Sequence, residues 1–244
     1  MTSNNNEVPS NEIPSNEVPS NEGILLINKP KGNTSFSLIR TLRKRLQIKK
    51  IGHAGTLDPF ATGVMVYLIG RDFTRLSDQF LNEDKEYLAQ IHLGVSTDTF
   101  DTEGQVTAYS EKVPTVKEVE DAVTKFQGKV QQIPPMYSAK KFKGQKLYDL
   151  ARKGKIVDRQ PVTIELVTTV LKYEYPYLDL RVNCSKGTYI RSIADDLGAM
   201  LGCGGHLSLL QRTRSGRFTL SDCIDGELLE NPSYDLASSI QKAC

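Results

Sequence analysis

Hydrophobic and polar residues alternate along this chain with two different periods. Apolar residues in short runs or at every second position predict β-strands, whereas apolar residues three or four apart predict helices. The ranges that fit strands are 24–27, 64–69, 87–93, 161–172, 177–184 and 207–219. The ranges that fit helices are 35–46, 114–126 and 189–201. Because the two types mix without a regular βαβ alternation, the pattern predicts an α+β fold with a mixed, largely antiparallel sheet and flanking helices.

Residues 6–20 depart from this pattern, since they repeat the pentapeptides NEVPS, NEIPS and NEVPS. A polar, acidic, Pro-rich repeat cannot bury enough apolar surface to offset the entropy of ordering. We therefore predict a disordered acidic tail over residues 1–22, a folded body over 23–214 and a short C-terminal extension over 215–244. The tail holds four of the 29 acidic residues and none of the 31 basic ones, so the rest of the chain carries a charge of +6. Such a charge mildly favours a polyanionic partner.

Composition excludes several classes of protein. No apolar run approaches the roughly 18 residues that a membrane span needs, and the N-terminus lacks the basic start and apolar core of a signal peptide. The four cysteines form no C-x-x-C pair, and the three histidines match no common zinc spacing. Neither a G-x-G-x-x-G nor a G-x-x-x-x-G-K-[ST] motif is present. We expect a cytoplasmic protein with reduced thiols, no metal site and no nucleotide cofactor.

Two stretches of the sequence are strongly basic. No acidic residue falls between positions 34 and 50, and cations fill much of the predicted helix outside its apolar face. Residues 136–155 hold seven Lys or Arg against one acid, with three aromatic residues interleaved. Cations bind phosphates and aromatic rings stack on bases, so both stretches are candidates for contact with RNA. The alternative for 136–155 is a surface helix whose aromatic residues pack inward.

The loop over residues 52–63, GHAGTLDPFATG, holds the main candidate for chemistry, Asp58. Its three glycines allow sharp turns and the close approach of another molecule. Pro59 biases Asp58 toward an extended backbone, just before the predicted strand 64–69. A carboxylate on a loop held by a rigid scaffold is a common catalytic arrangement. The alternative is an ordinary turn, because Asp and Pro both favour turns.

Five blocks of the chain resemble, in order, the motifs of the bacterial tRNA pseudouridine-55 synthase family of the TruB type. They read GILLINKPKGNTS, GHAGTLDPFATGVMVYLIG, DKEYLAQIHLGVSTDTFDTEG, QIPPMYSAKKFKGQKLYDLARKG and CSKGTYIRSIADDLG. Together they cover most of residues 23–214. The resemblance implies the pseudouridine synthase fold and an enzyme without cofactor or metal. Many members continue into a C-terminal RNA-binding domain of the PUA type, most of which is missing here, because only 30 residues follow Arg214.

The resemblance also implies roles for individual residues. Asp58 matches the catalytic aspartate that attacks the target nucleotide, at either the ribose C1′ or the uracil C6. Arg191 matches the arginine that pairs with this aspartate, and Tyr87 matches the tyrosine that stacks on the uracil and takes a proton from the intermediate. Two further positions, Tyr189 and Leu210, match residues lining the uracil pocket. His53 matches a histidine that contacts the everted RNA.

Physical chemistry agrees with these implied roles. A buried carboxylate is costly unless a cation compensates it, and only the ionised form is a nucleophile. A base stacked inside RNA cannot be reached, so the target must flip into a pocket. A tyrosine in that pocket can replace part of the lost stacking. Three acidic residues, Asp98, Asp101 and Glu103, lack the EF-hand spacing and are interpreted as turn residues. Lys29 contacts either RNA or solvent in this interpretation.

The sequence therefore predicts an enzyme that converts uridine-55 in the T-loop of tRNA to pseudouridine. Its expected partner is the T-stem-loop of tRNA, with no membrane and no required protein partner, and the expected state is a monomer. Two alternatives remain open. One is an RNA-binding or tRNA-folding protein on the same scaffold, and the other is a guide-dependent pseudouridine synthase that acts on other RNA.

Overall fold

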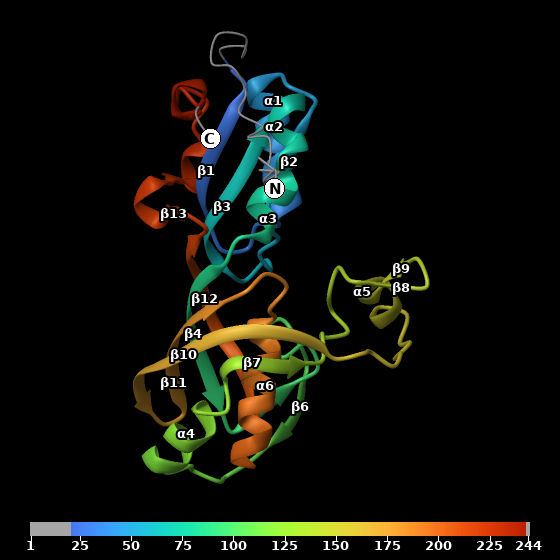
Figure 1. Cartoon of the computed structure of the whole chain (residues 1–244), viewed down its shortest axis with the longest axis vertical. Coiled ribbons are helices and arrows are strands. Elements are labelled where there is room, and N and C mark those ends of the chain that lie inside the picture. The colour runs from blue at the N-terminus through green and yellow to red at the C-terminus, as the bar shows by residue number, and fades with distance from the viewer. Residues whose placement is uncertain (1–20, 243–244) are drawn as a thin grey trace, which may run out of the picture.

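The structure is a computed structural model that describes residues 21–242. Two lobes stand end to end, and an arm projects sideways from the second lobe (Figure 1). Apart from Asn21 and Glu22, the predicted acidic tail lies outside the described residues. No helix in residues 21–242 is long and apolar enough to cross a membrane.

The first lobe is built mainly from the N-terminal third of the chain. Its elements are β1 (Gly23–Lys29), α1 (Ser35–Leu46), β2 (Ile51–His53), β3 (Thr62–Ile69), α2 (Arg71–Arg75) and α3 (Ser77–Asn82). Thr34 caps α1, because its side chain accepts a hydrogen bond from the Ser37 amide at 2.9 Å. The apolar face of α1, which includes Leu38, Ile39 and Leu42, is buried in the core. This burial explains why the sequence pattern located the helix correctly.

The second lobe contains a twisted sheet with two helices on one side. Its elements are β4 (Lys85–Leu93), β5 (Val95–Thr97), β6 (Val106–Tyr109), α4 (Val116–Val123), β7 (Gln127–Gln132), β10 (Val162–Glu174), β11 (Tyr177–Cys184), α6 (Ile190–Leu201) and β12 (Gly205–Ser215). Buried and less buried residues alternate along β4. Its buried side, which includes Tyr87, Ala89 and Ile91, belongs to the main core. Helix α6 packs against β12 and β4, and α4 packs against α6.

One ten-stranded sheet runs through both lobes in the order β14-β1-β3-β12-β4-β11-β10-β7, with β13 and β2 pairing at its side. Its pairs are antiparallel except for β1 with β14 and β3 with β12. The predicted α+β class with a mixed, largely antiparallel sheet is therefore confirmed. The lobes meet in the sheet where β12 pairs with β3, at Gln211 opposite Thr62 and Arg212 opposite Gly63.

Gly63 makes the close approach at this junction possible. Its φ angle is +113°, and a Cβ at this position would lie 2.2 Å from the Arg212 carbonyl oxygen. A side chain cannot occupy that space, so only glycine lets β3 and β12 come together here. The same pairing brings the loop that carries Asp58, which ends at β3, beside the strand that carries Arg212 and Leu210.

The C-terminal residues complete the first lobe. They form β13 (Phe218–Thr219), β14 (Ile224–Asp225) and three short 3-10 helices, η1 (Leu220–Asp222), η2 (Gly226–Glu230) and η3 (Ala237–Ser239). Strand β14 adds to the edge of β1, and Arg45 of α1 donates hydrogen bonds to the carbonyls of Leu229 at 2.9 Å and Tyr234 at 2.6 Å. Arg45 thus supports the fold, although its basic stretch was predicted to contact phosphates. The predicted domain boundary at residue 214 stays a prediction.

The arm corrects the sequence-based interpretation of residues 136–155. It contains a two-stranded hairpin, β8 (Lys141–Phe142) and β9 (Gln145–Lys146), and the short helix α5 (Leu147–Ala151). The alternative for this stretch, a surface helix whose aromatic residues pack inward, is therefore wrong. The residues that pack inward are Leu147 and Leu150, whereas Tyr148 is half-buried with Lys146 and Arg152 close to its ring. Residues 114–126 also form a shorter helix than predicted, because Thr115 caps α4 and the helix ends at Val123.

Candidate active site

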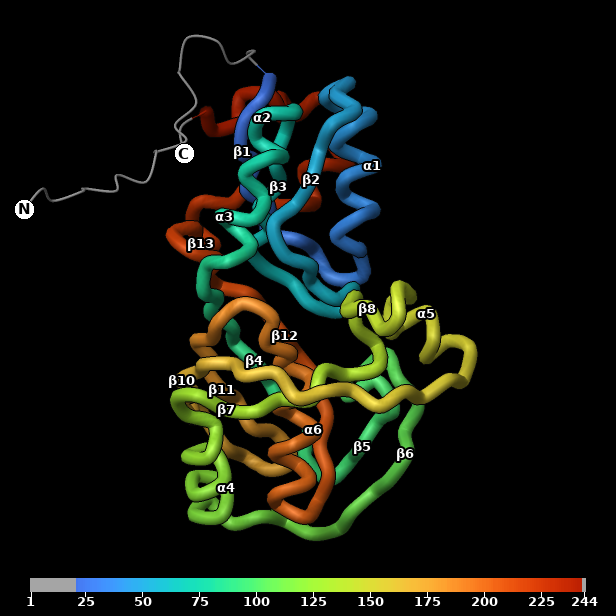
Figure 2. Tube along the Cα trace, turned by 45° about the vertical axis from the view of Figure 1, so that its right-hand side comes forward, coloured from blue at the N-terminus to red at the C-terminus, as the bar shows by residue number. Residues whose placement is uncertain are grey.

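The loop between β2 and β3 carries Asp58 to the junction of the two lobes, near the base of the arm (Figure 2). The loop is fixed from both sides. The Leu57 amide donates a hydrogen bond to the buried Ser35 hydroxyl at 3.1 Å, and the Ala61 amide donates to the Asp58 carbonyl at 3.1 Å. The Asp58 side chain retains 35% exposure. The carboxylate is therefore held on a rigid loop but remains accessible to another molecule.

Lys29 anchors this loop from the protein interior. It is fully buried, so it contacts neither solvent nor RNA. Its ammonium group donates hydrogen bonds to the carbonyls of Pro30, Asn33 and Pro59 at 2.7 to 3.1 Å. Burial lowers the pKa of Lys29 to about 8, against the opposing charges of Asp58 and Glu103. The expectation that Lys29 meets RNA or solvent is wrong, because its role is to tie the residue after Asp58 to the end of β1.

Arg191, the second residue of α6, pairs with Asp58 as predicted. Its Nε donates to Oδ2 of Asp58 at 2.8 Å, and its Nη2 donates to Oδ1 at 3.3 Å. The remaining donors reach the carbonyl oxygens of Thr99 at 3.0 Å and Tyr137 at 2.8 Å. The side chain is only 5% exposed. Because Nε and Nη2 of this buried guanidinium each donate to one oxygen of Asp58, Arg191 fixes the orientation of the carboxylate. It also places a positive charge beside it.

A second carboxylate, Asp101, lies against the same guanidinium and was missed from the sequence. Its Oδ2 is 3.4 Å from Nε of Arg191, and its side chain is 4% exposed. Its Oδ1 accepts hydrogen bonds from the Thr99 hydroxyl at 2.6 Å and from the Glu103 amide at 2.9 Å. These local bonds are typical of a turn, which is how the sequence pattern around Asp101 is interpreted above. A burial of this kind is typical of a carboxylate that is paired with a buried cation.

Tyr87 and Tyr189 lie close enough to Asp58 for its charge to raise the pKa of each hydroxyl, although burial is the larger cause in both. Tyr87 is buried on β4, and Tyr189 is half-buried at the residue before α6. The backbone of Tyr189 is held by Gln132, which accepts from its amide at 2.8 Å and donates to its carbonyl at 3.0 Å. Leu210 is buried on β12 opposite Ala89. The structure thus gathers Asp58, Arg191 and both tyrosines.

His53 ends β2, five residues before Asp58. Its ring lies edge-on against Tyr67 at 6.4 Å between centroids, and its Nδ1 is buried with no hydrogen-bond partner. Burial lowers the pKa of His53, so the neutral ring is favoured. A buried ring nitrogen without a partner is unusual. Its contact with everted RNA stays a prediction.

The charges around Asp58 offset one another. The carboxylates of Asp58, Asp101 and Glu103 act on the same space as the cations of Lys29 and Arg191. Burial raises the pKa of Glu103, and the neighbouring carboxylates raise it further. Acidic and basic groups gathered in this way around a half-exposed carboxylate are typical of an active site.

Family comparisons agree with this geometry. Residues 43–190 match the TruB family pseudouridylate synthase N-terminal domain, and residues 191–241 match the tRNA pseudouridylate synthase B C-terminal domain. The chain belongs to the TruB family of pseudouridylate synthases. Asp58 and Tyr87 fall in the first matched region, and Arg191 and Leu210 fall in the second. The predicted resemblance and the predicted class of enzyme, a tRNA pseudouridine synthase, are confirmed.

Relatives in the TruB family match nearly the whole chain. A tRNA pseudouridine synthase B of Protochlamydia amoebophila is 66% identical over 84% of this chain and 78% of its own. That of Chlamydia pneumoniae is 59% identical over 91% of this chain and 94% of its own. The Francisella philomiragia enzyme of the same name is 45% identical over 87% of this chain and 71% of its own.

Solved structures with the same fold include a Cbf5 complex and an H/ACA RNP. A Cbf5-Nop10-Gar1 complex aligns with a TM-score of 0.71 and 28% identity, over 98% of this chain and 67% of that chain. An H/ACA RNP bound to a substrate RNA containing 2′-deoxyuridine aligns with a TM-score of 0.66 and 25% identity, over 98% and 66%. The mixed sheet of this TruB family member is thus the scaffold of pseudouridine synthases.

Proposed function

We propose that this protein isomerises uridine-55 in the T-loop of tRNA to pseudouridine, with Asp58 as the catalytic carboxylate. The observation that carries the proposal is the pairing of a half-exposed Asp58 with the buried guanidinium of Arg191. The names of the relatives support the substrate, since each is a tRNA pseudouridine synthase B.

The geometry suits a carboxylate that must stay ionised and directed at a nucleotide. Arg191 contacts both oxygens of Asp58, so the carboxylate is held in one orientation. The Asp58 side chain keeps 35% exposure on a loop at the junction of the lobes, so a flipped nucleotide can reach it. The reaction breaks the bond from N1 to the ribose, turns the uracil, joins C5 to C1′, removes the proton from C5 and places one on N1. The reactant and the product are isomers, so no oxidant or second substrate is consumed.

We assign the remaining residues to the uracil pocket. Tyr87, which is buried on β4 close to Asp58, stacks on the flipped uracil and accepts the C5 proton. Tyr189 and Leu210 line the pocket, since one lies beside Arg191 and the other is buried on β12 next to β4. His53 contacts the everted RNA near the start of the catalytic loop. Stacking on such residues is worth roughly 1–3 kcal/mol per base, which compensates part of the cost of flipping.

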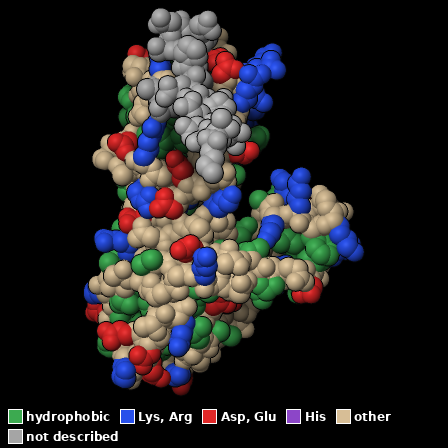
Figure 3. All heavy atoms as spheres, in the orientation of Figure 1, with side chains coloured by type: hydrophobic (Ala, Val, Ile, Leu, Met, Phe, Trp, Pro, Cys, Tyr) green, Lys and Arg blue, Asp and Glu red, His purple; other side chains and the backbone are tan. Residues whose placement is uncertain are grey.

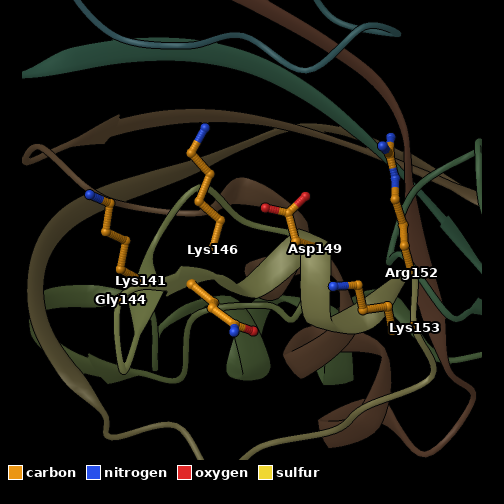
Figure 4. A pocket seen from close by; sticks show the side chains of 7 residues that line it. Lys141, Gly144, Lys146, Asp149, Arg152 and Lys153 are labelled. Carbon is orange, nitrogen blue, oxygen red and sulfur yellow. The ribbon is translucent and has the colours of Figure 1, made fainter.

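The arm and α1 supply the surface for the RNA backbone. Basic side chains gather along the arm and on the edge beside α1 (Figure 3). On the arm, Lys146 and Arg152 stand on either side of Asp149 (Figure 4) and border a hollow of about 670 Å³. On α1, Arg40 and Lys44 are exposed on one face, one turn apart, next to Phe36 at 57% exposure. Exposed cations along a helix that begins at the active site suit the phosphates of an RNA stem.

Charge reversal on α1 tests this surface. The double variant Arg40→Glu/Lys44→Glu should raise KM for tRNA by roughly tenfold and lower the salt slope of binding by about 2, since two phosphate contacts are lost. At saturating tRNA, kcat should stay near its wild-type value. Filter binding over a salt series and initial rates measure both quantities. Lys125→Glu/Lys129→Glu makes the same charge change on exposed residues of the second lobe, and an equal effect of this control pair would contradict the assignment.

The activity itself is tested with the purified protein and an unmodified tRNA transcript. We expect pseudouridine at position 55 without guide RNA or protein partner, detected by nucleoside mass spectrometry and sequence mapping. Binding without isomerisation would favour the tRNA-folding alternative. A requirement for guide RNA would favour the guide-dependent alternative, for which the H/ACA RNP is the structural precedent.

We further propose that the protein acts alone, as a cytoplasmic monomer. Asp58, Tyr87 and Arg191 all come from one chain, so the site is complete without a second copy. The free thiols of Cys184, Cys203 and Cys223 suit a reducing compartment, as does the tRNA named for the relatives.

A further inference from the structure

Arg212 on β12 is the largest fully buried side chain among the described residues, with 1% exposure. Its Nε donates a hydrogen bond to the Val64 carbonyl at 2.7 Å, and its Nη2 lies 3.0 Å from the sulfur of Met65. Both partners belong to β3, so the guanidinium is held across the junction of the lobes. The reaction assigned above to Asp58 and Arg191 makes no use of this second buried arginine.

No carboxylate of residues 21–242 pairs with this guanidinium. None of the ion pairs in residues 21–242 includes Arg212. A buried cation without a counter-ion is costly, and a carbonyl oxygen and a thioether compensate only part of its charge. A negative charge formed beside this guanidinium would compensate the rest of its charge.

Two parts of the active site border the Arg212 side chain. Tyr87 lies directly opposite it in the antiparallel register of β4 and β12, and both residues are buried. Directly opposite residues on one face of a sheet have Cβ atoms about 5 Å apart. On its other side, a Cβ at Gly55 would lie 3.4 Å from Nη1 of Arg212. The guanidinium therefore lies between the Tyr87 side chain and the turn that precedes Asp58.

We infer that Arg212 is a positioning residue that stabilises the phenolate of Tyr87, so that Tyr87 can accept the proton from C5. The inference rests on the proposed function and on the role of Tyr87 in it. Tyr87 enters the step as phenolate, and its oxygen takes the proton from C5 after the new carbon–carbon bond has formed. The electron pair of the C5–H bond restores the C5–C6 double bond, and N1 gains a proton from water. Tyr87 then returns its proton to water, so protons balance over the cycle.

The electrostatics of the pocket point the same way. Burial raises the pKa of the Tyr87 hydroxyl, and the charge of Asp58 raises it further, whereas the Arg212 guanidinium opposes the rise. The pKa of Tyr87 is raised overall, and without the opposing cation it would rise further, so the phenolate that the step needs would be less populated. Arg212 is the cation opposite Tyr87 in the strand register. The other buried arginine, Arg191, is paired with Asp58 and Asp101 instead.

The test separates proton removal from the earlier steps. Arg212→Met keeps the length of the side chain and removes its charge, and should lower kcat on a uridine T-stem-loop on the order of 100-fold. With [5-²H]uridine at the target, the isotope effect on kcat should increase, because C5 deprotonation becomes rate-limiting. A stem-loop with 5-fluorouridine at the target can form the C5–C1′ bond but has no C5 proton to remove, so the variant should form this C5-linked fluorinated product at close to the wild-type rate. Mass spectrometry of the nucleosides measures all three.

Controls distinguish this role from a structural one. Arg214→Met lies on the same strand and removes a surface ion pair with Asp84, so it should leave both substrates unaffected. If Arg212→Met does not fold, Arg212→Lys, which moves the charge away from Tyr87, should show the same selective loss on uridine to a smaller degree. Equal losses on uridine and 5-fluorouridine, or an unchanged isotope effect, would overturn the inference. Lack of wild-type activity on uridine would instead reject the proposed function.

Discussion

Replacing Asp58 by Asn is expected to abolish pseudouridine formation while tRNA binding stays close to that of the wild type. The amide keeps the size of the side chain but cannot act as a nucleophile or carry charge. The buried Arg191 keeps its bonds to the carbonyls of Thr99 and Tyr137 and its ion pair with Asp101, so the fold should persist. We expect kcat to fall by at least roughly 10⁴-fold, as for the loss of other catalytic nucleophiles.

The measurement is single-turnover conversion of a T-stem-loop, followed by nucleoside mass spectrometry, with affinity measured separately. Asp121→Asn on α4 is the matched control, since Asp121 is an exposed aspartate in a surface ion pair with Lys117. That control should retain full activity. Turnover by Asp58→Asn near the wild-type rate would exclude Asp58 as the catalytic carboxylate. A parallel loss of tRNA binding would show that the residue serves mainly to hold the substrate.

The fold was predictable wherever one face of an element is buried. In β4 and α1 the apolar positions follow the period of the element, so the sequence alone located both. The arm was harder, because only Leu147 and Leu150 are buried in α5 and its hairpin depends on Gly144, which has a φ of +83°. Such short elements carry too few apolar residues for a period to be recognised.

The active site was predictable only where a motif carried it. Asp58 and Arg191 were assigned from family blocks, and their contact at 2.8 Å agrees with that assignment. Asp101 was missed because its local bonds satisfy a turn, while its burial depends on a helix 90 residues further along the chain. One signal was available, since a guanidinium has five donors and Asp58 can accept only some of them. The donors of Arg191 that Asp58 cannot satisfy therefore indicate that a further acceptor lies nearby.

Buried cations form the other group that the sequence could not place. Lys29 and Arg212 are buried and Arg45 is half-buried, and each donates to backbone carbonyls although its sequence context is typical of a solvent-exposed residue. Local patterns report the burial of apolar side chains well, because these repeat with the element. A long cationic side chain that ends on carbonyls from another segment leaves no such periodic signal. For this reason the basic stretch over residues 40–50 combines exposed cations, for which we propose contact with RNA, with the structural cation Arg45.

Replacing Arg191 by Met is expected to cost both stability and activity. Four groups from three segments of the chain converge on this guanidinium: Asp58, Asp101 and the carbonyls of Thr99 and Tyr137. Methionine fills much of the volume but leaves the buried Asp101 carboxylate without a cation. Breaking a buried pair in this way costs about 3 kcal/mol or more in the free energy of unfolding. We also expect kcat to fall by roughly 10³-fold, because Asp58 loses its charge partner and its fixed orientation.

A double variant separates the two effects. In Arg191→Met/Asp101→Asn the unpaired buried charge is removed, so most of the lost stability should return, as measured by the midpoint of urea unfolding. Activity should not return, because Asp58 still lacks its guanidinium. Arg191→Lys keeps a charge but not the planar fork, so it should be more active than the Met variant and less active than the wild type. If the double variant regained activity together with stability, Arg191 would act on the fold alone, and the orientation of Asp58 would have to come from the loop that Lys29 and Ser35 hold.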